Sequence, residues 1–572
     1  MTRQHTILRD ARVPMRDGVE LAADVYVPGG EGPFPTLLQR TPYDKTDPFG
    51  TQFIVQMTIV RALDAGFAVV VQDTRGRFAS AGAFDPFVHE AEDGADTVAW
   101  IRSQDFSDGR VASYGASYVG ATQMLLAMQG AEGHVAMAPF LTTGDYHQHW
   151  AYRDGALQLG LVYLWITEAL GPIDVEKRQL AVDDPARQTL SGLLADPREA
   201  MDRLPVLADD MVQLAPYLAD WLGNPMPDRW WSAHTPLAHA EAIRTPALHI
   251  AGFNDIFLEG SLRSYETLRR HGATPEVRDG QYLVIGPWSH GNIGDWQGDL
   301  WHGYEAAAPA LDLTGMQLAF FTAVLEGRRP ELPRVRYFTS GVNEWRTGEE
   351  WPPAAEETTL HLAAAGRLVA RPEDEEGVDR YVSDPLDPVP TAGGATFLPG
   401  LLLNRNDGPK PQEAVEARDD VLVYRGEVLA DPVEVTGLVT LELWASSSAT
   451  DCDWTARLTD VDEADHSIGL VDGILRARYR HGGDPTPLIP GEVECFTVEL
   501  GHISHLFAAG HRIGLQVASS NFPRFDRNSQ QMVDPVRAQA DDFVVARQSV
   551  IRGGARPSRL LLPTVSRSDD RT

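Results

Sequence analysis

The chain has 572 residues, which is enough for about three domains of ordinary size. Its 81 Asp and Glu outnumber its 49 Lys and Arg, and the resulting formal net charge of −32 argues against nucleic acid as a partner, because that field repels phosphate backbones. Residues 1–14 and the short apolar runs elsewhere contain no signal-peptide-like or membrane-spanning segment, and Cys452 and Cys495 are too few for a disulfide framework. We therefore expect a cytoplasmic protein without a membrane partner.

The first part of the chain alternates between predicted strands and helices. A strand over residues 19–27 follows the turn at Asp17-Gly18. The next short apolar runs lie at residues 36–38, 66–71, 110–114, 246–251 and 282–285, and helical spacing is found at 58–65, 91–101, 260–270 and 312–325. Apolar runs without polar alternation are typical of parallel strands covered on both faces. The pattern predicts an α/β fold with a doubly wound sheet.

A stretch with few strand signals interrupts this alternation between Asp145 and His239. Residues 156–170 and 205–222 have helical spacing and many aromatic side chains. Insertions at the carboxyl edge of an open sheet lie over the crevice where ligands bind, so we interpret this stretch as a helical cap over an active site. A helical side-domain with only a structural role is the alternative.

The pattern changes again after residues 345–353, which are rich in Pro, Glu and Trp. Short alternating runs separated by Gly, Pro, Asp and Asn follow at residues 359–361, 421–424, 438–445, 454–458, 494–500 and 512–518. Such runs are typical of an antiparallel β-sandwich. The sequence thus predicts a doubly wound domain over 1–145 and 240–350, a helical insertion over 146–239 and an all-β domain over 351–572.

Ser117 is the first candidate for a catalytic residue. It lies in Gly115-Ala-Ser-Tyr-Val-Gly120, between a predicted strand and a predicted helix. A sharp strand-to-helix turn needs small neighbours and points the helix N-terminal amides towards a developing oxyanion. The segment departs from the usual G-x-S-x-G pattern because Val119 occupies the position of the second glycine. A serine that merely caps a helix is the alternative.

Two further residues complete a possible Ser-acid-His order along the chain. Asp255 follows one predicted strand in Gly-Phe-Asn-Asp, and His290 follows the next in Gly-Pro-Trp-Ser-His, with room between them for one crossover helix. A serine hydroxyl needs a neutral imidazole to remove its proton, and the imidazole needs a carboxylate to fix its tautomer. The alternative interpretation, which holds for each residue considered alone, is that Asp255 is a turn residue and His290 is a surface or core residue.

These motifs resemble the cocaine-esterase-like branch of the α/β-hydrolases, which also includes α-amino-acid ester hydrolases, glutaryl acylases and Xaa-Pro dipeptidyl-peptidases. Further matching segments run through nearly the whole chain: residues 15–21, 40–45, 72–77, 429–437, 450–454, 472–480 and 519–525. The resemblance implies an α/β-hydrolase domain with an inserted helical cap, followed by a C-terminal jelly roll. It also implies a serine hydrolase that cleaves an ester or an amide through an acyl-enzyme.

The resemblance assigns a role to each candidate residue. It implies that Ser117 is the acylated nucleophile, His290 the general base and acid, and Asp255 the partner that orients His290. The hydroxyl of Tyr43 and the backbone N–H of Tyr118 are implied to hold the oxyanion, where a neutral donor stabilises developing charge. A packed turn aromatic is the alternative for Tyr43.

Three aromatic residues match the acyl pocket of the esterase members: Trp150, Trp165 and Phe257. Packing within the core is the alternative interpretation, because Trp and Phe at helical spacing are most often core residues. The amino-ester hydrolases and dipeptidyl-peptidases of the family instead need carboxylates to hold a substrate ammonium group. For the dipeptidyl-peptidases, Asp145 and Glu168 in the cap are the candidates for that role. For the amino-ester hydrolases we find no such cluster, and residues 118–120 beside Ser117 offer no carboxylate.

No cofactor and no metal are expected. His147 and His149 have no carboxylate or Cys ligand at suitable spacing, so we expect them to be solvated or packed in the cap, and we expect Asp73 and Arg75 to support the site without a catalytic role. The expected partner is a small ester or amide, and a homo-oligomer is possible. An inert binding protein whose jelly roll recognises a carbohydrate or another partner is the alternative, although an inert site has no reason to retain the triad and the oxyanion tyrosine.

Overall fold

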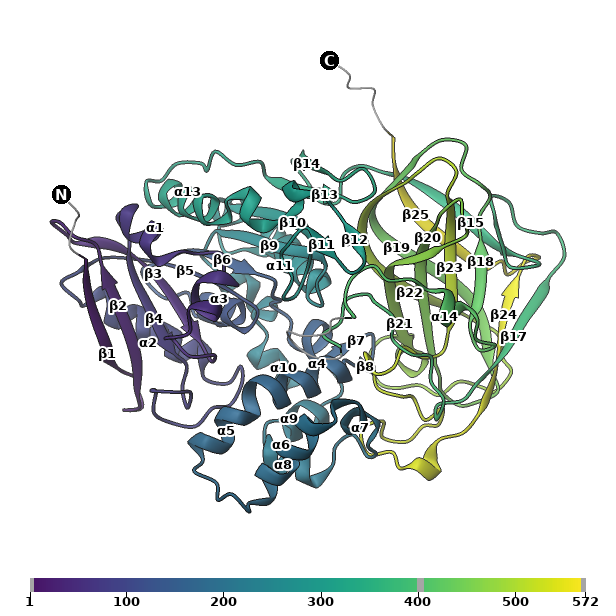
Figure 1. Cartoon of the computed structure of the whole chain (residues 1–572), viewed down its shortest axis with the longest axis horizontal. Coiled ribbons are helices and arrows are strands. Elements are labelled where there is room, and N and C mark those ends of the chain that lie inside the picture. Colours follow the sequence, from purple (N-terminus) through teal and green to yellow (C-terminus); the bar gives the residue numbers. More distant parts are fainter. Residues whose placement is uncertain (1–4, 399–405, 567–572) are drawn as a thin grey trace.

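A ten-stranded mixed sheet forms the centre of the first part of the molecule (Figure 1). The computed structural model describes residues 5–398 and 406–566. The strand order in this sheet is β1-β2-β4-β3-β5-β6-β9-β10-β13-β14. The bounds are β1 (Thr6–Pro14), β2 (Glu20–Val27), β3 (Phe34–Thr41), β4 (Ala68–Asp73), β5 (Ser107–Ala116), β6 (His134–Phe140), β9 (Ala247–Asn254), β10 (Gln281–Ser289), β13 (Val335–Thr339) and β14 (Glu344–Gly348).

The sheet is parallel from β4 to β13, as the unbroken apolar runs predicted. All six residues of β4 are buried, and its successive valines serve opposite faces of the sheet. Val69 and Val71 pack in the same core as α1 (Ile59–Asp64) and α13 (Leu313–Leu325). Val70 packs in another core with residues of α2 (Glu90–Arg102) and α3 (Tyr118–Met128). Helices on both faces confirm the doubly wound α/β prediction.

Short helices between β6 and β9 form the predicted helical cap, which lies along the lower side of the molecule in Figure 1. They are α4 (Leu159–Leu164), α5 (Gly171–Lys177), α6 (Pro185–Ala195), α7 (Pro197–Asp202), α8 (Asp209–Leu214), α9 (Leu218–Gly223) and α10 (Arg229–His234). The remaining helices of this part are α11 (Leu258–His271), which connects β9 to β10, and α12 (Pro275–Asp279).

Two predicted cap helices were too long. Ala156–Leu157 is a strand, β8, which pairs with β7 (Tyr152–Arg153) across a turn where Gly155 has a φ of +85°. The segment 205–222 is divided between α8 and α9, because Pro216 restricts the backbone of the residue before it and lacks the N–H that a continuous helix needs. The aromatic pattern was thus correct as a marker of burial, but it overestimated helix length.

The second part of the chain is an all-β domain with an antiparallel sheet, on the right in Figure 1. Its elements are β15 (Glu356–Ala363), β16 (Arg367–Val369), β17 (Gly377–Ser383), α14 (Glu413–Glu416), β18 (Leu422–Arg425), β19 (Val433–Ser447), β20 (Asp453–Val461), β21 (Ser467–Arg476), β22 (Glu494–Phe507), β23 (Arg512–Ala518), β24 (Ala546–Arg552) and β25 (Arg559–Val565). Each predicted alternating run lies within or overlaps one of these strands. The runs did not include β16, β17, β21, β24 or β25.

An ion pair joins the two parts beside the first turn of α11. The side chain of Glu259 accepts hydrogen bonds from the backbone N–H and from Nδ1 of His502, on β22, at 2.7 and 2.8 Å. Against the cost of burial, His502 lowers the pKa of Glu259 to about 2, and Glu259 raises the pKa of His502. Glu259 lies four residues after Asp255 in the sequence, so this ion pair connects the all-β domain to the predicted active-site loop.

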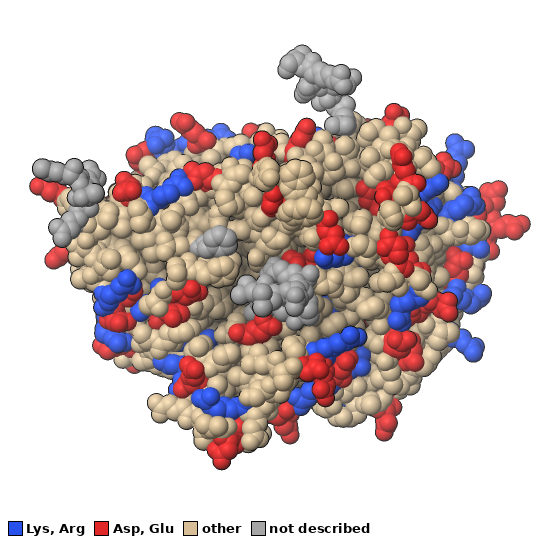
Figure 2. Space-filling model, in the orientation of Figure 1, with Lys and Arg blue, Asp and Glu red and all other residues tan. Residues whose placement is uncertain are grey.

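The surface carries both signs of charge. On the face drawn in Figure 2, acidic and basic side chains are interspersed over both halves of the molecule. Within residues 5–398 and 406–566, no helix is long and apolar enough to cross a membrane.

Candidate active site

Ser117 stands in a strained turn between β5 and α3. Its φ of 59° and ψ of −129° are rarely adopted by a residue with a side chain, and such strain is typical of a nucleophile elbow. The flanking glycines are sterically required. A Cβ on Gly115 would lie 2.2 Å from Cγ1 of Val119, and a Cβ on Gly120 would lie 2.5 Å from Cγ2 of Thr142. The segment around Ser117 therefore forms the expected sharp strand-to-helix turn, although its second glycine stands at position 120 and not at 119.

His290 joins the other two candidate residues of the triad. Its Nδ1 lies 2.6 Å from Oδ1 of Asp255, and its Nε2 lies 2.9 Å from Oγ of Ser117. The three residues immediately follow β5, β9 and β10, whose carboxyl ends lie at one edge of the parallel sheet. With Nδ1–H donated to the carboxylate, Nε2 is free to accept the serine proton. The geometry suits general-base activation of a serine hydroxyl.

Tyr43 lies on the loop after β3 and faces the same serine. Its Oη accepts a hydrogen bond of 2.9 Å from Nε1 of Trp165. Burial raises the pKa of the Tyr43 phenol to about 12, and hydrogen bonds with Trp165 and Ser117 act against that rise. The phenol therefore stays protonated at any ordinary pH. Tyr118 is the first residue of α3, so its backbone N–H has no acceptor within the helix. Both predicted oxyanion donors lie beside Ser117.

Hydrogen bonds to Asp73 hold the loop that carries Tyr43 in place. Its carboxylate accepts from the backbone N–H of Lys45 at 2.7 Å and from that of Ala79 at 3.1 Å. Burial raises the pKa of Asp73 to about 6. Arg75 pairs with Asp93 at 2.6 Å in the same region. These contacts agree with the expectation that Asp73 and Arg75 support the site.

A hydrogen-bonded group that the sequence did not reveal anchors the Tyr118 side chain. Its Oη donates to Oε1 of Glu90 at 2.6 Å and accepts from the backbone N–H of Phe87 at 2.9 Å. Burial raises the pKa of Glu90 to about 7. Phe87 has a left-handed backbone with φ 73°, and its ring stacks on Tyr146 with 4.2 Å between ring centroids. This group fixes the Tyr118 side chain at the start of α3, directly after Ser117.

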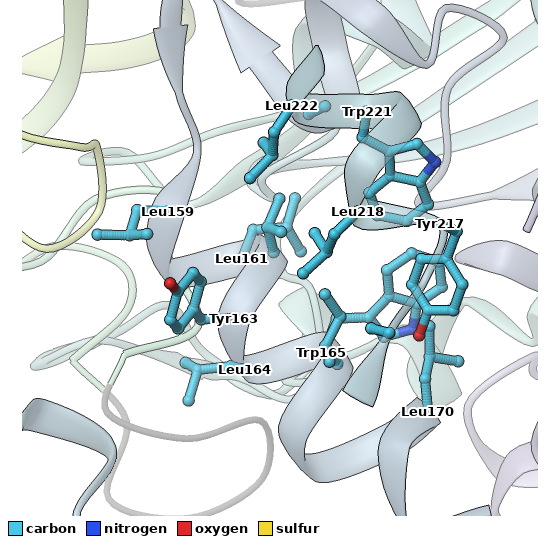
Figure 3. Close-up of a cluster of buried hydrophobic side chains, with 14 of the residues drawn as sticks. Leu159, Leu161, Tyr163, Leu164, Trp165, Leu170, Tyr217, Leu218, Trp221 and Leu222 are labelled. Carbon is cyan, nitrogen blue, oxygen red and sulfur yellow. The ribbon is translucent and has the colours of Figure 1, made fainter. Parts of the chain in front are cut away.

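The three predicted substrate-binding aromatics come together next to His290. Trp150 stacks on Phe257 with 4.3 Å between ring centroids and lies 5.2 Å from Trp165. Phe257 meets the His290 ring edge-on at 5.0 Å. All three side chains are at most 4% exposed and belong to one apolar cluster with the cap. Figure 3 shows Trp165 in this cluster, beside Leu218 and Trp221. The cluster therefore forms one side of the site, and the predicted role in substrate binding stays a prediction.

Phe397 is a neighbour of the site that sequence reasoning missed. Its ring lies perpendicular to that of His290 at 4.8 Å, and it comes from the all-β domain, in the loop between β17 and α14. A lone Phe in a loop without periodicity gives no signal of its own, so only the packing of the two domains reveals it. The all-β domain thus contributes a side chain to the site.

Asp145 and His147 form hydrogen bonds within the cap. Asp145 accepts from the backbone N–H groups of His147 and Gln148, and Nε2 of His147 lies 3.0 Å from the Pro225 carbonyl oxygen. The part of the chain that the structure describes holds no group of three or more His, Cys, Asp or Glu that could bind a metal ion.

Comparisons with known proteins agree on one class. Residues 17–292 match the family model of X-Pro dipeptidyl-peptidase (S15 family), and residues 330–561 match the model of the X-Pro dipeptidyl-peptidase C-terminal non-catalytic domain. Cocaine esterase of Rhodococcus sp. (strain MB1 Bresler) is 38% identical over 98% of this chain and 99% of its own length.

Solved structures with similar folds include an α-amino acid ester hydrolase, with 25% identity and a TM-score of 0.81 over 99% of this chain and 97% of that chain. An aminopeptidase from a marine sediment archaeon (Thaumarchaeota archaeon) has 25% identity and a TM-score of 0.80 over 98% of this chain and 97% of that chain. The fold and these relatives define an enzyme of the serine-hydrolase class. The chain belongs to the cocaine-esterase-like family of α/β-hydrolases.

Proposed function

We propose that the enzyme cleaves carboxylic esters through an acyl-enzyme on Ser117. The observation that carries this proposal is the continuous hydrogen-bonded row from Asp255 through His290 to Ser117. In the first half-reaction, Ser117 Oγ attacks the carbonyl carbon while its proton passes to Nε2 of His290. The tetrahedral oxyanion accepts hydrogen bonds from the Tyr43 hydroxyl and the Tyr118 amide.

The same groups complete the cycle. When the ester C–O bond breaks, His290 gives its proton to the leaving alkoxide, which departs as the alcohol. His290 then takes a proton from water, which attacks the acyl carbon, and returns that proton to Ser117 Oγ as the carboxylic acid leaves. Asp255 keeps the imidazole oriented and stabilises it while it is positively charged. No metal or cofactor takes part in this scheme.

We further propose that the acyl group lies against Trp150, Trp165 and Phe257, so that aromatic or bulky apolar acyl groups are preferred. Apolar side chains beside His290 support an uncharged acyl group, because a substrate ammonium would need a free carboxylate. Of the carboxylates near the site, Asp174 pairs with Arg77, and one oxygen of Glu90 accepts a hydrogen bond from Tyr118. Amino-acid-ester and X-Pro dipeptide cleavage rank below ester cleavage for this reason. Amide cleavage also ranks below ester cleavage, because an amine is a poorer leaving group than an alcohol.

The remaining expectations rest on the sequence alone. We propose a small-molecule substrate and a reducing, cytoplasmic location, the latter from the cysteine count.

Active-site labelling tests the catalytic proposal directly. A fluorophosphonate probe should modify the folded enzyme once, at Ser117, and a p-nitrophenyl ester should give a burst of nitrophenol equal to the enzyme concentration when deacylation is slower than acylation. Substrates for comparison are aryl esters, amino-acid esters, glutaryl amides and X-Pro dipeptide anilides. Folded protein that resists the probe would favour the inert binding protein instead.

A further inference from the structure

Trp165 makes a contact that a pocket-lining residue does not need. It lies where α4 gives way to a π-helical turn over Trp165–Leu170, and its side chain is 4% exposed. Its indole Nε1–H donates to Tyr43 Oη at 2.9 Å. The indole is a donor only, so the phenol must be the acceptor in this contact. The direction of the hydrogen bond is therefore fixed by chemistry.

This direction decides where the phenol proton points. Tyr43 Oη has one proton and two lone pairs, and one lone pair is occupied by Trp165. The other hydrogen-bond partner of Tyr43 is Ser117, whose own proton is directed to Nε2 of His290. The phenol proton is thus left for the side of Oη that faces the nucleophile. A hydroxyl that accepts one hydrogen bond is also polarised into a better donor.

We propose that Trp165 is a positioning residue for the oxyanion hole: its Nε1–H holds the Tyr43 hydroxyl with the phenol proton directed at the oxyanion. The inference rests on the proposed oxyanion role of Tyr43. The positioning role of Trp165 does not depend on the size of the acyl group. A role as a wall of the acyl pocket would depend on it.

Two neighbouring tryptophans show that this contact is a specific feature of Trp165. Trp221, on α9, stacks on Trp165 with 5.8 Å between ring centroids (Figure 3). The ring centroid of Trp150 lies 5.2 Å from that of Trp165. Nε1 of Trp150 and Nε1 of Trp221 are both buried and have no hydrogen-bond partner among the described residues. Aromatic packing in this cluster therefore does not itself require an indole N–H. Trp221 provides a matched control, since it shares the surroundings but lacks the contact.

A double-mutant cycle tests the proposal. Trp165→Phe keeps an aromatic ring but removes the donor, and it should lower kcat by about 3- to 10-fold, the effect of one neutral hydrogen bond, equally for acetyl and benzoyl p-nitrophenyl esters and with little change in KM. In a Tyr43→Phe background the same change should have almost no further effect on kcat, because the group that it positions is already gone. Trp221→Phe should change kcat by the same factor in both backgrounds.

If Trp165→Phe disturbs the cap, benzothienylalanine at position 165 provides a second test. Its ring system has nearly the same shape as indole but lacks the N–H. This replacement should reproduce the loss of kcat at an unchanged melting temperature. Losses that multiply in the double mutant, or a loss restricted to benzoyl esters, would overturn the positioning role and leave Trp165 as a packing or pocket residue. If Tyr43→Phe alone leaves kcat unchanged, the proposed oxyanion role of Tyr43 is itself wrong, and this separate measurement distinguishes the two failures.

Discussion

The triad and the aromatic cluster meet at His290, but they are built in different ways. Ser117, Asp255 and His290 each follow a strand of one parallel sheet, so backbone topology brings them together. The aromatic residues come from the cap, from the loop after β9 and from the all-β domain, and side-chain packing alone makes them neighbours. Under the proposed function, the sheet positions the catalytic residues, and the packed aromatic cluster selects the substrate. Changes in the two regions should therefore have different signatures.

The largest effect is expected at the nucleophile. Ser117→Ala should lower kcat by at least ~10³-fold for every ester, because the covalent route is lost and only binding and oxyanion stabilisation remain. His290→Ala should be comparably damaging, with circular dichroism unchanged for both variants. More than about a tenth of the wild-type rate in either variant, measured with p-nitrophenyl esters, would contradict the triad.

The second largest effect is expected at Tyr43, the proposed oxyanion donor, which lies between the triad and the aromatic cluster. Tyr43→Phe keeps the ring but removes the hydroxyl, so kcat should fall by about 10²–10³-fold with little change in KM. Because the pKa of Tyr43 is raised to about 12, the wild-type enzyme should show no loss of rate from ionisation of this phenol up to at least pH 10. A raised KM with an unchanged kcat would make Tyr43 a substrate-contact residue.

A smaller, selective effect is expected in the aromatic cluster. Phe257→Ala should lower kcat/KM for a benzoyl ester by about 10–100-fold more than for an acetyl ester, because only the larger acyl group uses that surface. We choose Phe257 for this test since its ring has no polar atom and isolates packing from hydrogen bonding. Equal losses for the two esters, together with a lower melting temperature, would assign the cluster to core packing.

The smallest effect concerns stability at the contact between the domains. Glu259 raises the pKa of His502, so this group stabilises the folded state fully below its unfolded pKa of about 6.5, and the contribution is lost as the pH rises through the raised folded value. The contribution of Glu259, whose folded pKa is about 2, is already complete above about pH 5.

His502→Gln should consequently lower the melting temperature by about 2 °C at pH 6, and the difference from wild type should shrink towards pH 9. His466→Gln, at an exposed histidine on a turn of the all-β domain, is the control and should have little effect at either pH. A difference for His502→Gln that grows with pH would contradict the assigned direction of the shift.

The catalytic residues at the strand ends were predictable because the signal for each is a short stretch of neighbouring residues in the sequence. Apolar runs without alternation mark buried parallel strands, and the polar residues that follow such a run lie at the carboxyl edge of the sheet. The elbow around Ser117 also carried its own signal, since Gly115 and Gly120 stand where any Cβ would meet a neighbouring side chain. The cap was predictable as a helical, aromatic-rich stretch, although Pro216 and the strand at Ala156–Leu157 shortened its helices.

The sequence by itself determined the α/β-hydrolase core, the order of the candidate triad and the all-β domain, because periodicity and chain order are properties of the sequence. Only the tertiary structure decided that Glu90 anchors Tyr118, that Phe397 reaches His290 from the other domain and that Trp165 donates to Tyr43. Each of these contacts joins residues that are remote along the chain or that carry no pattern of their own. Their partners are chosen by shape and hydrogen-bond geometry in the folded interior, which a linear pattern does not encode.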